Sequence, residues 1–152
     1  MTVLVKWFLV TALSGTALFL AQTQGALSLI ITNDKSYLGL SIMILYSLTT
    51  LYLGKIAFDM DITKKEEMSK FNSKTGIGWF IAEHFFTLGL LGTIIGLVLA
   101  TGGAMNGNLP VSQIVAGLKE GLNTAFFTTI CGIVFSLLLQ IQLLVLRYEK
   151  KA

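Results

Sequence analysis

Residues 77–100 read IGWFIAEHFFTLGLLGTIIGLVLA, and this stretch decides the fold. Its only ionisable side chains, Glu83 and His84, lie near its start. An α-helix needs roughly 20 predominantly apolar residues to cross the hydrocarbon core of a bilayer. The stretch therefore predicts a membrane-spanning helix over about residues 77–101.

The rest of the chain has the same character. Hydrophobic residues make up 54% of the 152 residues, charged residues 12%, and the mean hydropathy is +0.77, whereas soluble domains carry about 25% charged residues. We therefore expect an all-α, polytopic membrane protein that forms a single transmembrane domain over residues 1–152. The predicted spans are about 7–24, 36–58, 77–101 and 121–146, with a cytoplasmic loop at 59–75 and an outer loop at 102–120.

Basic residues predict the orientation of these spans. If the N-terminus is inside, nine basic residues fall on the cytoplasmic side and only Lys35 and Lys119 on the outer side. This bias follows the positive-inside rule, so both termini are predicted to be cytoplasmic. A secretory signal peptide over Met1–Ala21 is disfavoured, because Phe19 occupies the position where a cleavage site needs a small residue.

Small residues recur at helical spacing in the last two spans. Gly89, Thr93 and Gly96 share a face, and Gly92 and Gly96 form a small-xxx-small pair. The last span carries two such stripes, Ala125-Thr129-Gly132-Ser136 and Gly117-Gly121-Thr124-Thr128. They fit two interpretations: surfaces for helix packing alone, or a polar pathway to which Thr93, Thr128 or Thr129 supplies a hydroxyl.

No Asp, Glu, Lys or Arg lies in the middle of any of the four predicted spans. A bundle that moves protons usually needs such a group at membrane depth, so a proton channel built from this chain would take its titrating carboxylate from a partner chain. Glu83, near the inner end of its span, is either an interfacial residue or the cytoplasmic exit of a proton path. The single His and single Cys predict no metal site, and we expect no enzymatic activity, no cofactor and no nucleic-acid partner.

Two motifs then become recognisable together. Residues 88–97 (LGLLGTIIGL) resemble the pore-helix motif LGLLGTVxGL of the MotA/TolQ/ExbB proton-channel family. Residues 125–132 (AFFTTICG), with Ile133 following, resemble the matching last-helix motif of that family. Their order and the short loop between them also agree with the family.

This resemblance implies a homopentamer in the bacterial inner membrane, whose pore encloses two copies of a single-span ExbD/TolR/MotB-like partner. The partner's aspartate would carry the proton, and the chain would be the stator subunit of a rotary motor driven by the proton-motive force. Thr93 and Thr129 match the pore threonines of the family. The candidate pore-lining residues are Thr93, Thr129, Thr128 and Thr124, and the candidate pore-helix glycines are Gly89, Gly92, Gly96 and Gly132.

The chain also departs from the family pattern. Glu120 lies about two turns before Thr129. ExbB- and TolQ-type members often carry a glutamate on the last helix near this threonine. Only about 16 residues, 59–74, replace the large cytoplasmic domain of MotA-type members, although a count of four helices is MotA-like. Two alternatives stay open: a scaffold protein whose glycines serve assembly only, and a small transporter or holin-like pore.

Overall fold

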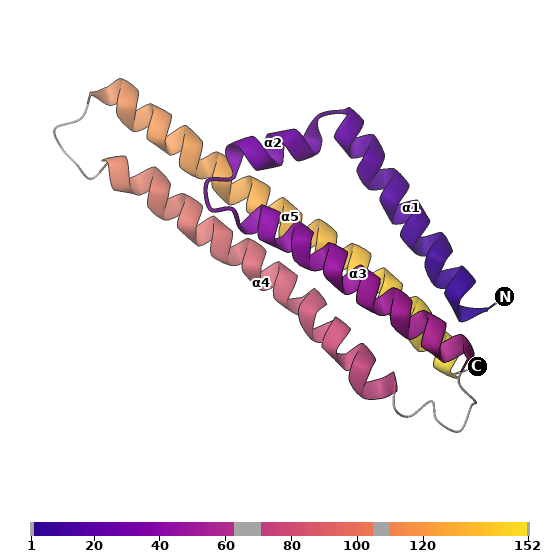
Figure 1. Ribbon diagram of the computed structural model, residues 1–152. Coiled ribbons are helices and arrows are strands. Elements are labelled where there is room, and N and C mark those ends of the chain that lie inside the picture. Colours follow the sequence, from indigo (N-terminus) through magenta and orange to yellow (C-terminus); the bar gives the residue numbers. More distant parts are fainter. Residues whose placement is uncertain (1, 63–70, 105–109, 152) are drawn as a thin grey trace.

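The computed structural model describes residues 2–62, 71–104 and 110–151. Within these ranges the chain forms α1 (Val3–Thr23), α2 (Ala26–Asn33), α3 (Leu38–Ile62), α4 (Phe71–Ala104) and α5 (Val111–Lys151). Figure 1 shows α4 and α5 as a long antiparallel hairpin with α3 lying along it. The N- and C-termini lie at the same end of the molecule, and α1 diverges from α3 toward α2. The fold is all-α, as predicted.

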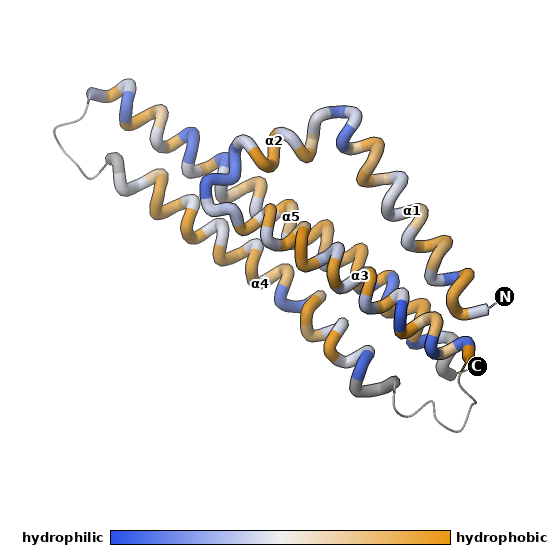
Figure 2. Tube along the Cα trace, in the orientation of Figure 1, coloured by the Kyte–Doolittle hydropathy of each residue, from blue (hydrophilic) through white to orange (hydrophobic). Residues whose placement is uncertain are grey.

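Four helical segments of the described chain are long and apolar enough to cross a membrane: Val3–Thr23, Leu38–Ile62, Lys74–Gly102 and Val111–Tyr148. The eight-residue helix α2 is too short to span a bilayer. Figure 2 shows hydrophobic residues along the length of these helices, with hydrophilic residues gathered toward the ends of α3, α4 and α5.

The helices extend beyond the spans predicted from hydropathy. Residues 59–62 and 71–75 of the expected cytoplasmic loop are helical, as are residues 102–104 and 111–120 of the expected outer loop. Hydropathy detects only the apolar part of a helix, and polar residues continue the helical backbone where no proline interrupts it. At 1.5 Å per residue the 41 residues of α5 span about 60 Å, twice the hydrocarbon thickness of about 30 Å.

Local signals set the ends of the N-terminal helices. Gly25 has φ 77°, a left-handed conformation that glycine adopts at low cost, and it separates α1 from α2, which the sequence did not predict as a helix. At the other end of α1, Asp61 accepts hydrogen bonds from the Val3 and Leu4 amides at 2.8 and 2.9 Å. The end of α3 thus caps the start of α1, satisfying amides that a helix leaves unpaired.

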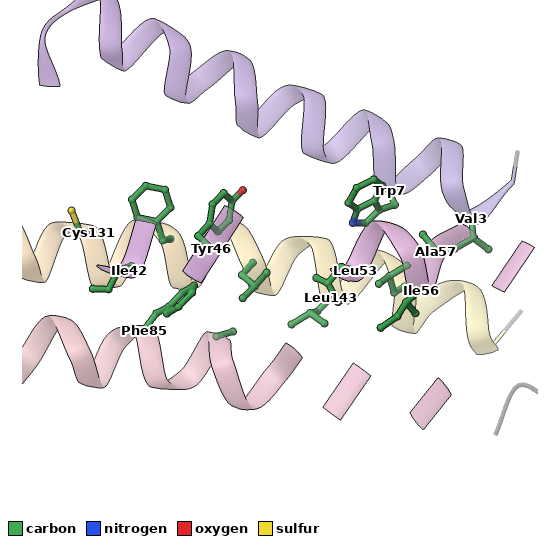
Figure 3. Packing of buried hydrophobic residues seen from close by; sticks show 14 of the residues in the cluster. Val3, Trp7, Ile42, Tyr46, Leu53, Ile56, Ala57, Phe85, Cys131 and Leu143 are labelled. Atoms are coloured by element: carbon green, nitrogen blue, oxygen red, sulfur yellow. The ribbon is translucent and has the colours of Figure 1, made fainter. Parts of the chain in front are cut away.

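Buried apolar side chains join α1, α3, α4 and α5 in one cluster (Figure 3). Leu53 of α3 and Leu143 of α5 are completely buried, and Phe85 of α4 is 1% exposed. On the other side of α3, the Trp7 ring lies directly over Gly54, where a Cβ would come within 2.6 Å of the ring. The cluster fixes α3 against the α4–α5 hairpin and attaches α1 at its N-terminal end.

The turn between α2 and α3 is bonded to α5. The Thr124 hydroxyl accepts a hydrogen bond from the Lys35 amide at 3.2 Å and lies 3.0 Å from the Asn33 carbonyl oxygen, to which it donates. The Lys35 ammonium lies 2.9 Å from the Glu120 carboxylate, which raises the pKa of Lys35. Asp34, 4% exposed, caps the start of α3 by accepting a hydrogen bond from the Gly39 amide.

We expect Thr124→Val to destabilise the fold by about 1–3 kcal/mol, because it removes the hydroxyl that bonds the Lys35 amide and the Asn33 carbonyl in these part-buried contacts. Thr128→Val is the matched control. The Thr128 hydroxyl bonds to the Thr124 and Ala125 carbonyls of its own helix. We therefore expect Thr128→Val to lower the free energy of unfolding clearly less than Thr124→Val does. Denaturant unfolding in detergent measures both values, and equal losses would contradict the docking role of Thr124.

We expect Gly121→Ala to destabilise the α4–α5 hairpin by about 1–3 kcal/mol through overpacking. A Cβ on Gly121 would lie 2.6 Å from the Ala100 Cα, a backbone atom that cannot move aside alone. Gly117→Ala, one turn earlier, is the control, because nothing lies within 4 Å of a Cβ there. Thermal unfolding of the two variants in detergent should separate them, and identical stabilities would refute the close approach at Gly121.

Candidate functional site: the seam between α4 and α5

The seam between α4 and α5 is lined by glycines on both helices. A Cβ on Gly89 would lie 3.0 Å from the Gly132 Cα, and a Cβ on Gly96 would lie 2.5 Å from the Gly121 oxygen. Gly92 faces the Thr128 side chain, which fills the space that a Cβ would need. Gly89, Gly92, Gly96 and Gly132 are therefore close-contact positions of the seam, where α4 and α5 pack backbone to backbone.

Thr93 and Thr129 meet across this seam. Their hydroxyl oxygens are in direct hydrogen-bond contact, and both side chains are half-buried. The Thr129 hydroxyl lies 2.9 Å from the Ala125 carbonyl oxygen, and the Thr93 hydroxyl lies 3.2 Å from the Gly89 carbonyl oxygen. The structure thus pairs the two threonines that the motifs single out, and leaves part of the pair accessible from outside the chain.

Thr124 and Thr128 lie elsewhere. Both are completely buried within the single chain, Thr124 against the α2–α3 turn and Thr128 against Gly92. A side chain with no exposed surface in one chain cannot line a pore that several chains enclose. The structure turns Thr124 and Thr128 toward their own subunit, and neither contributes to the outer surface of the seam.

A groove of about 440 Å³ adjoins the seam on the side of the termini. Its polar residues are Glu83 of α4 and Ser136 and Gln140 of α5, and its apolar residues are Phe86, Ile133 and Leu137. Ser136 donates to the Ala82 carbonyl at 2.7 Å, and Gln140 donates to the Ser136 hydroxyl at 3.1 Å. Gln140 was missed by the sequence analysis, although it continues the Thr129-Gly132-Ser136 stripe by one further turn.

Glu83 is exposed at this groove. Ten residues separate it from Thr93, about 15 Å along the helix, so the two side chains do not touch. Its neighbour His84 is turned to another face, where its Nδ1 donates to the Phe80 carbonyl at 2.7 Å and its ring lies against the Phe80 ring. Glu83 and His84 are therefore not a facing pair.

Among the described residues, no group of three His, Cys, Asp or Glu side chains is placed to hold a metal ion. The polar groups of the seam are hydroxyls, an amide and one carboxylate at its end. They can form hydrogen bonds with water or with a helix laid along the seam, but the Thr93–Thr129 pair itself has no titrating group to carry a proton.

Comparison with known proteins places this geometry in a family. Searches for similar curated proteins and for similar solved structures gave no match. A family model, that of the MotA/TolQ/ExbB proton channel family, matches residues 53–150. The matched region contains residues 53–62 of α3, all of α4 and nearly all of α5, and so the whole seam. Helices α1 and α2 lie outside it.

This match covers well over half of the chain. Members of the family are non-enzymatic, multi-pass membrane proteins of the bacterial inner membrane with a stator-like role as proton channels, and they typically pair with ExbD/TolR/MotB-type proteins. With its seam of glycines and paired threonines, this chain belongs to the MotA/TolQ/ExbB proton channel family.

Proposed function

We propose that this chain is the pore-forming stator subunit of a rotary motor driven by the proton-motive force. Five copies would enclose the transmembrane helices of two ExbD/TolR/MotB-like partner chains. The observation that carries the proposal is the contact between the Thr93 and Thr129 hydroxyls on a half-buried seam. The seam presents a polar pair at membrane depth without an ionisable group, which suits a pore whose proton carrier comes from another chain.

The charged residues nearest to the seam support this division of labour. Glu83 lies about three turns from Thr93 toward the end that holds the termini, and Glu120 is paired with Lys35 at the opposite end of the bundle. Neither carboxylate reaches the threonine pair. An aspartate on the partner's helix would therefore bind and release the proton, driven by about 2.3 kcal/mol per charge for each 100 mV of membrane potential.

Large apolar side chains on the outer surfaces of α4 and α5 support assembly into an oligomer. Leu90 and Ile94 of α4 are 47% and 53% exposed in the single chain, and Phe126 of α5 is 64% exposed. In a bilayer these surfaces contact lipid or other helices, and helices that enclose a pore need neighbours on both sides. A ring of five copies would cover much of this surface.

The placement of the termini supports the proposed orientation. Both termini lie at one end of the molecule (Figure 1), and Lys6, Lys55 and Arg147 occupy the helix turns near that end. Lys35 and Lys119 lie toward the other end. With the termini in the cytoplasm this arrangement satisfies the positive-inside rule, and the Glu83 groove becomes the candidate cytoplasmic exit of the proton path.

We expect Thr93→Val and Thr129→Val each to lower proton flux about 10- to 100-fold. Each variant would lose a hydrogen bond to the charged aspartate of the partner, and such a bond is worth about 1.5–3 kcal/mol. Thr93→Ser and Thr129→Ser keep the hydroxyl and should retain flux. Flux is measured with a pH-sensitive dye in proteoliposomes that contain the chain and its partner.

Thr128→Val provides the internal control for this experiment, because Thr128 is buried away from the outer surface of the seam and should leave flux near the wild-type value. If both Thr93→Val and Thr129→Val conduct normally in an assembled complex, the chain is a scaffold and not a channel subunit. Flux from the chain without its partner would favour an independent pore.

Purification in mild detergent should give five copies of this chain with two copies of a single-span protein that carries a membrane aspartate. Native mass spectrometry measures this stoichiometry directly. Replacing the partner's aspartate with asparagine should abolish flux while the complex stays assembled. A stable monomer that supports proton flux without a partner would contradict the proposal.

A further inference from the structure

Glu83 lies deeper in the membrane than the basic residues at the end that holds the termini. On α4 it follows Lys74 by nine residues, about 13 Å at 1.5 Å per residue. On α5 its neighbours in the groove, Ser136 and Gln140, precede Arg147 by eleven and seven residues, about 16 and 10 Å. A helical side chain covers about the turn before its own Cα, so the Glu83 carboxylate does not reach the level of Lys74.

This depth decides what the surface around Glu83 can contact. Glu120 and Arg147 of α5 are 27 residues apart, about 40 Å, whereas the hydrocarbon core of a bilayer is about 30 Å thick. A core centred between these two charges ends about 5 Å from each, so it includes the level of Glu83. A carboxylate at this depth faces the interior of an assembly or water, because contact with lipid is costly. The exposed surface at Glu83 is therefore turned away from lipid.

The Glu83 groove and the threonine pair lie on the same face of the hairpin. Thr129, Ser136 and Gln140 are separated by seven and four residues, which places them on one face of α5. A helix that lies along the Thr93–Thr129 pair inside the assembly therefore continues past Ser136 and Gln140 to Glu83.

Hydrogen bonds in the groove leave oxygen acceptors facing its space. The Ser136 hydroxyl donates its proton to the Ala82 carbonyl at 2.7 Å, so toward Gln140 it acts only as an acceptor. The Gln140 amide must therefore direct an N–H group at Ser136, which leaves its carbonyl oxygen pointing away from that bond. Within residues 2–62, 71–104 and 110–151 the Glu83 carboxylate has no hydrogen-bond or ion-pair partner. The groove thus offers a carboxylate and an amide oxygen to a cationic donor.

The apolar walls of the groove indicate which kind of cation fits. Phe86, Ile133 and Leu137 line it beside the carboxylate. A small metal ion takes several oxygen ligands and gains nothing from apolar walls. Lysine and arginine side chains, in contrast, lay a methylene stem along apolar surface and carry their charge at the tip. The groove therefore suits a lysine or arginine side chain.

A second copy of this chain does not supply that side chain. Copies in a ring around an axis normal to the membrane hold equivalent residues at equal depth. The basic residues that the structure describes on this side are Lys6, Lys55, Lys74 and Arg147, each about 10 Å or more from the level of Glu83. That distance is about two helix turns, further than a side chain reaches along its helix. The cation must come from a different chain.

We propose that the Glu83 groove binds a lysine or arginine side chain of the partner helix that the ring encloses. The contact rests on the proposed function, in which the partner's aspartate lies level with the Thr93–Thr129 pair. Glu83 is ten residues from Thr93, about 15 Å along the helix. The basic residue therefore lies about ten positions from the partner's aspartate, toward the side of the termini. The positive-inside rule favours lysine and arginine at the cytoplasmic end of a span. Five copies and two partner helices leave other grooves open to protons.

Cysteine cross-linking in the assembled complex locates the partner helix. Gln140→Cys, in a chain that also carries Cys131→Ala, is combined with single cysteines at successive partner positions, from its aspartate toward its cytoplasmic end. The yield of disulfide should peak about ten positions from the aspartate, beside the basic residue.

Leu13→Cys on α1 is the control for depth. Leu13 is 71% exposed, and its neighbour Ser14 bonds Tyr46, which accepts a hydrogen bond from Gln142 of α5. Leu13 therefore lies at a depth similar to that of Gln140 but on another surface, and its cysteine should form no disulfide with the partner.

Charge reversal tests the ion pair itself. Glu83→Lys should lower the amount of partner that co-purifies with the chain about tenfold, near the lower limit for close charge pairs at interfaces. Replacing the partner's basic residue with glutamate should restore co-purification. Glu83→Gln removes the charge alone and takes the place of Glu83→Lys if that variant does not assemble. Glu120→Gln, at the opposite end of the bundle, is the matched control and should retain the partner.

A complex that conducts protons but whose partner has no lysine or arginine at this level overturns the contact and leaves the proposed function intact. Full retention of the partner by Glu83→Lys and Glu83→Gln does the same. Disulfides between copies through Gln140→Cys overturn it as well, since a second copy would then cover the groove. A wild-type chain that purifies without any partner contradicts both the contact and the proposed function.

Discussion

The close approach of the α4 and α5 backbones is the contact on which the rest of the structure depends. Gly89 lies against Gly132, and Gly96 against Gly121, so close that a methyl group at any of them would meet backbone atoms. Lipid tails are as apolar as leucine side chains, so burial of hydrocarbon gives helices in a bilayer little reason to associate. Dispersion contacts between closely packed backbones supply the attraction instead, and small residues make them possible.

This spacing determines what the threonines of the seam can do. Because the helices touch at the glycines, the Thr93 and Thr129 hydroxyls meet across the seam. Deeper in the subunit, Thr124 bonds the α2–α3 turn and Thr128 fills the space beside Gly92. One helix thus uses neighbouring threonines for two purposes, a half-exposed polar pair on its outer side and buried hydroxyls that hold its own subunit together.

The N-terminal helices are attached to this hairpin by fewer contacts. α1 and α2 lie outside the family match, which begins at Leu53. α1 is held mainly at its start, by the Asp61 cap and by Trp7 over Gly54, and then diverges from α3. α2 and the turn after it return the chain to α5 at Asn33 and Lys35.

Much of the molecule could be predicted from the sequence, because hydropathy and local spacing are properties of neighbouring residues. The all-α class, the family and the glycine faces at 89, 92, 96 and 132 follow from such patterns. Local spacing does not predict which residues of α5 are buried. The stripe that contains Thr124 and Thr128 resembles the stripe that contains Thr129, and nothing within α5 indicates which of the two stripes faces its own subunit. The packing of α3 and of the Asn33–Lys35 turn against α5 buries the stripe of Thr124 and Thr128. This burial depends on residues about 90 positions away in the chain. The groove at Glu83, Ser136 and Gln140 and the position of α1 were decided in the same way, by contacts between segments distant in the sequence.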